Sequence, residues 1–164
     1  MTNRAIIVGS FDPIHFGHLN IINRSLNLFD EVIVALGINT SKKTLFSLEE
    51  RVFLAKEAVN EALFPLQDCV HVVTYDTLTV DLAKQFGNCC LVRGVRTASD
   101  YEYEMNVGAI NNKIAPSLET ILLLADPQLS IVSSSTVKEL SKFKYDVSKF
   151  VPKNIALALK EKFK

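Results

Sequence analysis

The sequence has no excess of charge of either sign, because its 164 residues include 18 basic and 18 acidic side chains. Nucleic-acid-binding proteins usually carry a basic surplus that neutralises the phosphate backbone. The charge balance therefore predicts no nucleic-acid partner. Any anion site in this chain has to be local, built from a few well-placed cations and backbone amides.

Cysteine is scarce, with only Cys69, Cys89 and Cys90 in the whole chain. An odd number without CxxC spacing supports neither a disulfide framework nor a zinc site. Cys89 and Cys90 begin an apolar run, so we expect them to be buried strand residues that behave as small hydrophobic side chains. A reducing cytoplasm suits this use of cysteine.

Long apolar runs are also missing, since none approaches the roughly 20 residues that span a bilayer. The N-terminal segment reaches Arg4 and then Gly9 too early for the apolar region of a signal peptide. We therefore expect a cytoplasmic location and no membrane partner. With 48% hydrophobic and 22% charged residues, the chain is typical of one globular domain over residues 1–164.

Short apolar, β-branched runs alternate with helical patterns along the chain. Strands are predicted over residues 5–8, 32–36, 70–74, 89–92 and 120–124. Helices are predicted over residues 18–28, 47–60, 78–86 and 97–114, then after Ser134 or Ser135, and from Pro152. This alternation predicts an α/β fold, a Rossmann-like doubly wound parallel sheet of five strands with helices on both faces.

Polar motifs follow the first, fourth and fifth predicted strands, where open parallel sheets bind their ligands. In the first motif, Gly9 allows close backbone approach to a ligand, and Gly17 removes bulk where a helix begins. The free amides of that helix start favour an anion, and His15 and His18 add donors. The same histidines could bind a metal, although no third ligand is nearby. A tight turn whose histidines only bond backbone also stays open.

The second motif is Arg93-Gly94-Val95-Arg96, which contains two of the five arginines. A guanidinium binds phosphate oxygens in a bidentate manner, which favours a phosphate site here. The alternative is a surface turn in which these arginines pair with Asp100 or Glu102.

The third motif is the serine-rich run over residues 129–135, before a predicted helix. Serine hydroxyls cap helix amides and also donate to phosphate, so the two roles are compatible. A further cation, Lys42, lies in Ser41-Lys42-Lys43 after the second strand. From sequence alone it is either a solvated charge or a phosphate ligand.

The first two motifs resemble those of a known family. Gly-Ser-Phe-Asp-Pro followed by His15-Phe-Gly-His18 resembles the signature of the nucleotidyltransferase superfamily of small Rossmann-like enzymes. Arg-Gly-Val-Arg followed by Asp-Tyr-Glu-Tyr-Glu, over residues 93–104, is similar to the bacterial phosphopantetheine adenylyltransferases. The resemblance covers residues 4–159, with the motifs in matching order and spacing.

This resemblance implies a role for each matching residue. His18 would stabilise the transition state, Ser10 would contact the phosphates of both substrates, and Arg93 would bind the acceptor phosphate. With Lys42 these three form the implied catalytic set. The implied ATP set is Ser10, Phe11, His18, Gly94, Val95, Arg96, Glu104, Leu129, Ser130, Ile131, Val132, Ser133, Ser134 and Ser135. The implied acceptor set is Ser10, Lys42, Thr79, Arg93, Met105 and Asn111.

The resemblance also implies the reaction, which is transfer of AMP from ATP to 4'-phosphopantetheine in coenzyme A biosynthesis. The products would be dephospho-coenzyme A and pyrophosphate. Mg²⁺ is the implied cofactor, and we expect it to arrive with the ATP phosphates because the sequence has no compact carboxylate cluster for a protein metal site. A homohexamer and feedback by coenzyme A are further expectations from the family.

Some residues depart from the family pattern. Val8, Ser10, Thr79 and Val132 replace, respectively, a common proline, threonine, apolar residue and isoleucine. His15 stands where threonine is more common, and it favours the nicotinate- or nicotinamide-mononucleotide adenylyltransferases instead.

Sequence features oppose three alternatives to this function. The motifs around Arg93 and Glu104 oppose the mononucleotide adenylyltransferases. The cytidylyltransferase branch typically has an Arg-Thr-rich final motif that is absent here. A non-catalytic ATP-binding module would not need to gather a second phosphate beside His18, Lys42 and Arg93.

Overall fold

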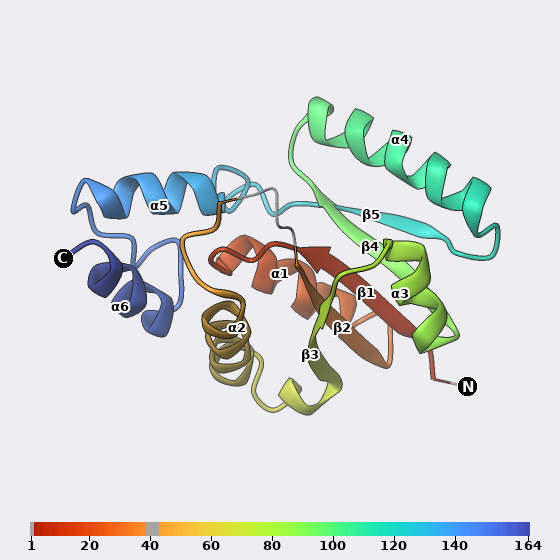
Figure 1. Ribbon diagram of the computed structural model, residues 1–164, viewed down its shortest axis with the longest axis horizontal. Helices are drawn as coiled ribbons and strands as arrows, with labels where there is room; N and C mark the ends of the chain where they lie inside the picture. Colours follow the sequence, from red (N-terminus) through yellow and green to blue (C-terminus); the bar gives the residue numbers. More distant parts are fainter. Residues whose placement is uncertain (1, 39–42) are drawn as a thin grey trace.

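The structure is a computed structural model that describes residues 2–38 and 43–164. Its centre is a parallel sheet in the order β3-β2-β1-β4-β5 (Figure 1). This arrangement confirms the predicted α/β fold. The strands are β1 (Arg4–Gly9), β2 (Glu31–Gly37), β3 (Val70–Tyr75), β4 (Cys89–Val95) and β5 (Thr120–Leu124).

Helices connect and flank these strands, as the alternating pattern predicted. A short 3₁₀ turn (Gln67–Cys69) precedes β3. The helices are α1 (Phe16–Ser25), α2 (Leu48–Ala62), α3 (Thr79–Phe86), α4 (Ala98–Ile114), α5 (Ser134–Lys142) and α6 (Lys153–Lys162). None of the helices within the described ranges is both long and apolar enough to cross a bilayer.

The strand order reverses at β1, in the middle of the sheet. From β1 the chain moves outward to β2 and β3, and it then returns to place β4 on the other side of β1. Ile6 of β1 therefore pairs with Ile33 of β2 on one side and with Leu91 of β4 on the other. In doubly wound sheets such a reversal opens a crevice at the carboxyl ends of the two strands, which is the usual place for a ligand.

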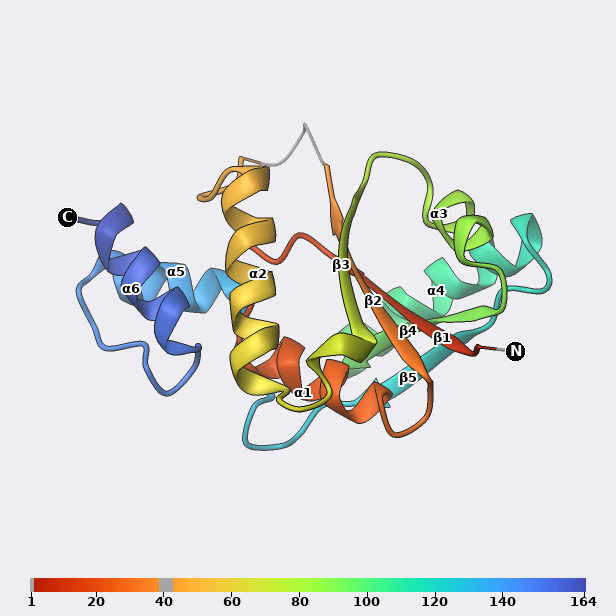
Figure 2. The same cartoon turned by 90° about the horizontal axis from the view of Figure 1, so that it is seen from below.

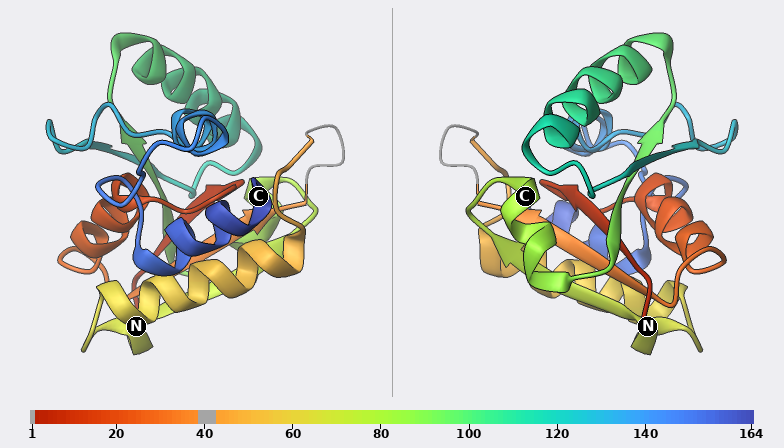
Figure 3. Two further views of the ribbon diagram at one scale, coloured as in Figure 1. Left: turned by 90° about the vertical axis from the view of Figure 1, so that its left-hand side faces the viewer. Right: turned by 90° about the vertical axis from the view of Figure 1, so that its right-hand side faces the viewer.

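Both faces of the sheet are buried, because successive side chains point to opposite sides. Ile7 and Val34 belong to the core beneath α1 and α2, whereas Ile6 and Ile33 belong to the core beneath α3. Figures 2 and 3 show α2 on one side of the sheet and α3 and α4 on the other. The helices α5 and α6 extend the first layer, with α6 packed beside α2 (Figure 1).

The cysteines are free thiols, as the sequence predicted. Cys89 is buried, and Cys90 is partly buried against the core. Burial raises the pKa of both thiols, so they act as small apolar strand residues.

Capping residues set the helix boundaries. The predicted capping box at α2 is confirmed, since Ser47 Oγ accepts from the Glu50 amide and the Glu50 carboxylate accepts from the Ser47 amide. Helix α1 begins at Phe16, earlier than predicted, because the His15 side chain caps it. Helix α5 is capped by Ser133 rather than by Ser134 or Ser135, because Ser133 has the extended backbone that a cap requires.

Candidate active site

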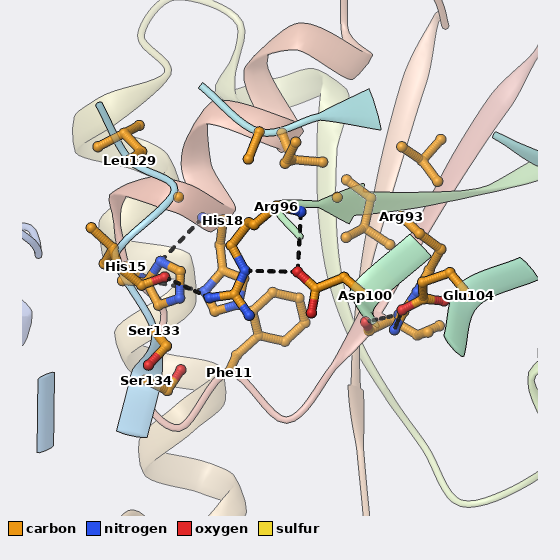
Figure 4. A pocket seen from close by; sticks show the side chains of 18 of the residues that line it. Phe11, His15, His18, Arg93, Arg96, Asp100, Glu104, Leu129, Ser133 and Ser134 are labelled. Carbon is orange, nitrogen blue, oxygen red and sulfur yellow. Dashed lines mark hydrogen bonds and ion pairs between the residues drawn. The ribbon is translucent and has the colours of Figure 1, made fainter. Parts of the chain in front are cut away.

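A cavity of about 390 Å³ opens at the carboxyl ends of β1 and β4. The start of α1 forms one wall, and the start of α4 and the segment before α5 form the others (Figure 4). The site-forming residues that line it are Phe11, His15, Gly17, His18, Arg93, Gly94, Arg96, Asp100, Glu104, Leu129, Val132, Ser133 and Ser134. The three predicted motifs therefore converge on one cavity.

His15 and His18 cap each other at the start of α1. The His15 amide donates to Nδ1 of His18 at 3.2 Å, and the His18 amide donates to Nδ1 of His15 at 3.3 Å. The two rings stack with centroids 3.7 Å apart. Because each Nδ1 accepts a backbone N–H, each neutral imidazole carries its proton on Nε2. The pair thus offers two N–H donors. Both rings also bond backbone amides, as the alternative of a tight turn predicted.

Both imidazoles stay neutral near pH 7. Burial, with the nearby positive charge of Arg96, lowers the pKa of His15 to about 4. Burial also lowers the pKa of His18 well below its ordinary value, and the charges of Arg96 and Arg93 add to this effect. Gly17 leaves room for this arrangement, since a Cβ there would lie 2.9 Å from Cε1 of His15.

The side chain of Arg93, near the carboxyl end of β4, has a fixed orientation. Its Nε and Nη2 donate to the two carboxylate oxygens of Glu104 at 2.8 and 2.6 Å, and its Nη1 donates to the Val8 carbonyl at 2.7 Å. Glu104 is 7% exposed, so this ion pair is largely shielded from water. A guanidinium has five N–H groups, and two of them remain to bind an anion. The acidic partner of Arg93 is therefore Glu104 and not Glu102, which the surface-turn alternative had proposed.

Arg96 ties the start of α4 to the segment before α5. Its Nε bonds the Asp100 carboxylate at 3.2 Å, and its Nη1 donates to the Val132 carbonyl at 3.1 Å. The alternative pairing of an arginine with Asp100 is therefore present, but the pair lines the cavity instead of lying in a separate surface turn. This bond connects two of the predicted ATP-binding segments.

A second cavity of about 260 Å³ adjoins the first. Val8, Arg93, Tyr103 and Glu104 line both cavities, so the Arg93–Glu104 pair stands at their junction. The predicted acceptor residues in this second cavity are Ser10, Thr79, Arg93 and Asn111.

Several residues that line the second cavity were not predicted from the sequence. Val107 and Gly108 of α4 line it, together with Gly37 and Tyr75 at the ends of β2 and β3. The helical repeat could have found Val107, because residues four apart from Asn111 lie on the same helix face.

Met105 does not join the other predicted acceptor residues. It is half exposed and lines a third cavity with Tyr101 and Leu122, which meets the second cavity at Glu104, Gly108 and Thr120. The reason is the helical repeat of 3.6 residues. Glu104 and Asn111 are seven residues apart and share a face of α4, whereas Met105 points about 100° away from Glu104. The assignment of Met105 to this pocket is thus corrected.

The remaining predicted residues are placed as follows. Ser130 Oγ donates to the Pro127 carbonyl, Ile131 is exposed and Val95 is buried. Neither these three nor Ser135 line either cavity. Lys42 lies outside the described residues, so the structure does not place it.

Ser10 lies at the end of β1, where α2 supports it. The Ser10 carbonyl accepts from Nη1 of Arg51 at 2.7 Å, and the same Nη1 lies 3.4 Å from the Gly37 carbonyl. Arg51 is 5% exposed, and no carboxylate among the described residues pairs with it. This buried cation adds positive charge beneath the site.

The side chains that commonly bind metals are dispersed over the described part of the chain. No group of three or more histidine, cysteine, aspartate or glutamate side chains gathers there. Asp100 and Glu104, the carboxylates that line the first cavity, already bond Arg96 and Arg93. The donors that remain are cations, N–H groups and hydroxyls, which suit phosphate oxygens.

The comparisons with known proteins agree with this chemistry. A family model described as cytidylyltransferase-like matches residues 6–140. The phosphopantetheine adenylyltransferase of Buchnera aphidicola is 42% identical over 164 residues, covering 100% of this chain and 97% of that protein. The protein of the same name from Porphyromonas gingivalis is 45% identical over 155 residues, covering 94% and 97%.

Solved structures show the same fold at low sequence identity. A crystal structure of a putative nicotinate-nucleotide adenylyltransferase from Vibrio parahaemolyticus superposes with a TM-score of 0.73 at 18% identity, covering 99% of this chain and 95% of that one. A Plasmodium falciparum nicotinic acid mononucleotide adenylyltransferase gives 0.73 at 17% identity, covering 99% and 96%. The family model covers most of the chain, and the relatives named phosphopantetheine adenylyltransferase match along nearly their whole length. This chain therefore belongs to the phosphopantetheine adenylyltransferase family.

Proposed function

We propose that this protein transfers AMP from ATP to 4'-phosphopantetheine and releases pyrophosphate. The product is dephospho-coenzyme A. The observation that carries this proposal is the junction of two cavities at the Arg93–Glu104 pair. One cavity contains most of the residues expected to bind ATP, and the other contains most of those expected to bind the acceptor.

The reaction needs positioning more than acid–base chemistry. The acceptor is a phosphate monoester that is largely ionised near pH 7, so its oxygen is already a nucleophile. That oxygen forms a bond to the α-phosphorus of ATP, and the bond from the α-phosphorus to the bridging oxygen breaks. The electron pair leaves with pyrophosphate. The protein therefore has to align two polyanions and offset their repulsion.

His18 is suited to stabilise charge at the α-phosphate. Its imidazole is neutral and carries its proton on Nε2, so it can donate a hydrogen bond as negative charge develops. His15, with the same geometry, supplies a second donor beside it. Proton transfer from either ring is not required for the chemical balance.

Arg93 is suited to hold the acceptor phosphate. Glu104 and the Val8 carbonyl fix its orientation at the junction of the cavities. Its two remaining N–H groups can bind phosphate oxygens with little loss of side-chain entropy, because the guanidinium is already ordered. Lys42, which the sequence assigns to the same phosphates, stays a proposal.

Mg²⁺ is proposed to enter with ATP. The carboxylates of the first cavity already bond arginines, so the described side chains suit a metal held by the triphosphate better than one held by the protein. When bound, Mg²⁺ would shield the triphosphate and the leaving pyrophosphate.

A homohexamer with feedback by coenzyme A is the proposed assembly and regulation. Exposed apolar side chains on α4, among them Tyr101, Met105, Ile110 and Ile114, support self-association because such patches often mark interfaces. Sedimentation at the mass of one 18.3 kDa chain would contradict this assembly. Coenzyme A contains both halves of the product, which supports competition at the same two cavities. The cytoplasm is the proposed location, since both substrates are charged and water-soluble.

One assay separates this function from its alternatives. The protein is mixed with Mg-ATP and, in separate reactions, with 4'-phosphopantetheine, nicotinate mononucleotide, nicotinamide mononucleotide or no acceptor, and pyrophosphate release is measured. We expect release only with 4'-phosphopantetheine. Release with a mononucleotide would assign the chain to the alternative that His15 favours, and no release with any acceptor would indicate a non-catalytic ATP-binding module.

A further inference from the structure

We propose that Asp12 is a positioning residue for His18, acting through Phe11, in the transfer reaction proposed above. Asp12 lies in the loop between β1 and α1, and it is 4% exposed. It is not among the residues that line either cavity. Asp12 therefore has to influence the reaction through its neighbours.

The Asp12 carboxylate joins three parts of the chain. Oδ1 accepts from the Phe46 amide at 2.9 Å, and Oδ2 accepts from the Leu45 amide at 2.9 Å and from Nζ of Lys138 at 2.8 Å. Leu45 and Phe46 precede α2, and Lys138 belongs to α5. The loop that carries Phe11 is thus fixed to two other elements of the site.

The carboxylate stays ionised despite its burial. Burial alone would raise its pKa, but the hydrogen bonds from Lys138 and from the two amides outweigh burial and hold the pKa below its ordinary value. The ionised form has two acceptor oxygens and can satisfy all three donors. An amide side chain would have one acceptor oxygen and would turn an N–H toward at least one donor.

Phe11, the residue before Asp12, has a backbone that needs such support. Its φ is +46°, in the left-handed region that costs a residue with a Cβ roughly 1 kcal/mol or more. The loop has to be held at several points for this conformation to persist, and the three bonds to Asp12 provide them. The ring of Phe11 also lies directly over Gly9, where a Cβ would be only 3.1 Å from it.

Phe11 connects this loop to His18. The two ring centroids are 4.8 Å apart, with the planes tilted by 59° (Figure 4). His18 is therefore held between the His15 ring on one side and the Phe11 ring on another. If the Phe11 backbone relaxed to negative φ, its ring would leave this place, and the His18 imidazole would lose one of the contacts that orient it.

A second bond connects the same loop to α5. Ser134 Oγ donates to the Pro13 carbonyl at 2.9 Å, next to the Lys138–Asp12 pair. The wall formed by Ser133 and Ser134 is thus bonded to the loop that carries Phe11, through a backbone carbonyl. Because this bond does not involve the Asp12 side chain, loss of Asp12 is expected to act on Phe11 and His18 without removing a group that touches substrate.

The kinetic test compares Asp12→Ala and Asp12→Asn with the wild type. We expect Asp12→Ala to lower kcat by about 100-fold, the scale of a small misplacement of a catalytic group, with a smaller change in KM for ATP. Asp12→Asn keeps one acceptor oxygen and should lose less. Matched controls are Lys142→Met, for an exposed lysine one turn beyond Lys138 on α5, and Asp146→Asn, for an exposed aspartate that lines neither cavity.

A double variant separates positioning from a general structural role. If Asp12 acts through His18, the variant Asp12→Ala/His18→Ala should have the same kcat as His18→Ala within about twofold, because the two residues act as a unit. Losses that multiply would overturn the inference, and so would a wild-type kcat in a folded Asp12→Ala protein.

A spectroscopic measurement keeps the inference testable apart from the proposed function. Nitrogen chemical shifts of the histidine rings report which ring atom carries the proton. We expect His18 to be protonated on Nε2 alone in the wild type, in Lys142→Met and in Asp146→Asn. In the two Asp12 variants the His18 ring loses the Phe11 contact and should turn partly away from the His15 amide that bonds its Nδ1, so a mixture of tautomers should appear. Unchanged His18 shifts in Asp12→Ala and Asp12→Asn would contradict the inference, whereas absence of AMP transfer by the wild type would contradict only the proposed function.

Discussion

At the scale of single residues, His15 and His18 cap the start of α1 and fix each other's tautomer, two tasks that usually need separate partners. Each Nδ1 satisfies an amide at the helix start, and each ring is thereby held in the tautomer that offers Nε2–H. The same bonds that begin the helix also prepare the donors for a phosphate. Local folding and chemistry thus depend on the same atoms.

His18→Ala should lower kcat by about 10²–10³-fold, the usual effect of removing a donor that stabilises developing charge. KM for ATP should change much less, because the interaction is strongest in the transition state. Steady-state pyrophosphate release measures both. His71→Ala is the matched control, since His71 is exposed on β3. A His18→Ala protein with near-normal turnover would remove this residue from its proposed role.

Arg93→Ala should raise KM for 4'-phosphopantetheine more than KM for ATP. It should also lower stability by about 3–5 kcal/mol, because it leaves the Glu104 carboxylate buried without its partner. The double variant Arg93→Ala/Glu104→Gln removes that charge and should regain stability without regaining acceptor affinity. Thermal unfolding and acceptor titration of the two variants test this, and normal acceptor kinetics in Arg93→Ala would place the phosphate elsewhere.

His15→Thr should reduce the loss of stability at acid pH. The folded-state pKa of His15 is about 4, below the ordinary 6.5, so the unfolded chain takes up this proton first as pH falls. The contribution of His15 to stability is therefore present above pH 6.5 and is lost toward pH 4, by about 3 kcal/mol in total. Threonine keeps a side-chain cap but does not titrate. Urea unfolding across this pH interval should show a shallower slope for His15→Thr, and equal slopes would contradict the account.

At the scale of helices and strands, periodicity and capping chemistry were good guides. The apolar runs predicted the five strands and their places along the chain, and the Ser47 capping box predicted the start of α2. The start of α1 was predicted too late, because histidine is not a common cap and the bond to His15 depends on the tertiary placement of its ring. The other error concerned α4, where Met105 was predicted to line the acceptor pocket together with Asn111. The helical repeat places these two residues on different faces of the helix.

Variants of Ser133 separate its structural role from its place in the site. Ser133→Ala should destabilise the protein by about 1 kcal/mol, because the cap of α5 is lost. Ser133→Asp should keep the cap and the stability, but it adds negative charge beside the proposed triphosphate site and should raise KM for ATP. Denaturant unfolding and ATP kinetics of both variants provide the measurement. Equal ATP kinetics in the two variants would mean that Ser133 lies away from the triphosphate.

At the scale of the whole molecule, the function depends on a feature that no single motif contains. The reversal of strand order places the ends of β1 and β4 side by side, and the Arg93–Glu104 pair then divides the crevice into two joined cavities. The sequence predicted that the motifs carrying Ser10, His18 and Arg93 would meet at one edge of the sheet, because motifs at the carboxyl ends of parallel strands share an edge. In the structure His18 lines the first cavity, Ser10 lines the second, and Arg93 lines both. The sequence could not predict that Glu104 would fix Arg93, or that Arg51 and Asp12 would support the loop from behind. Those contacts depend on helix packing.

The two joined cavities should bring an acceptor phosphate to the α-phosphorus of ATP. The most direct measurement follows radioactive phosphorus placed in either the α- or the γ-position of ATP during a reaction with 4'-phosphopantetheine. We expect the α-label to appear in dephospho-coenzyme A and the γ-label in pyrophosphate. Transfer of the γ-label to the acceptor, or of neither label, would contradict this expectation.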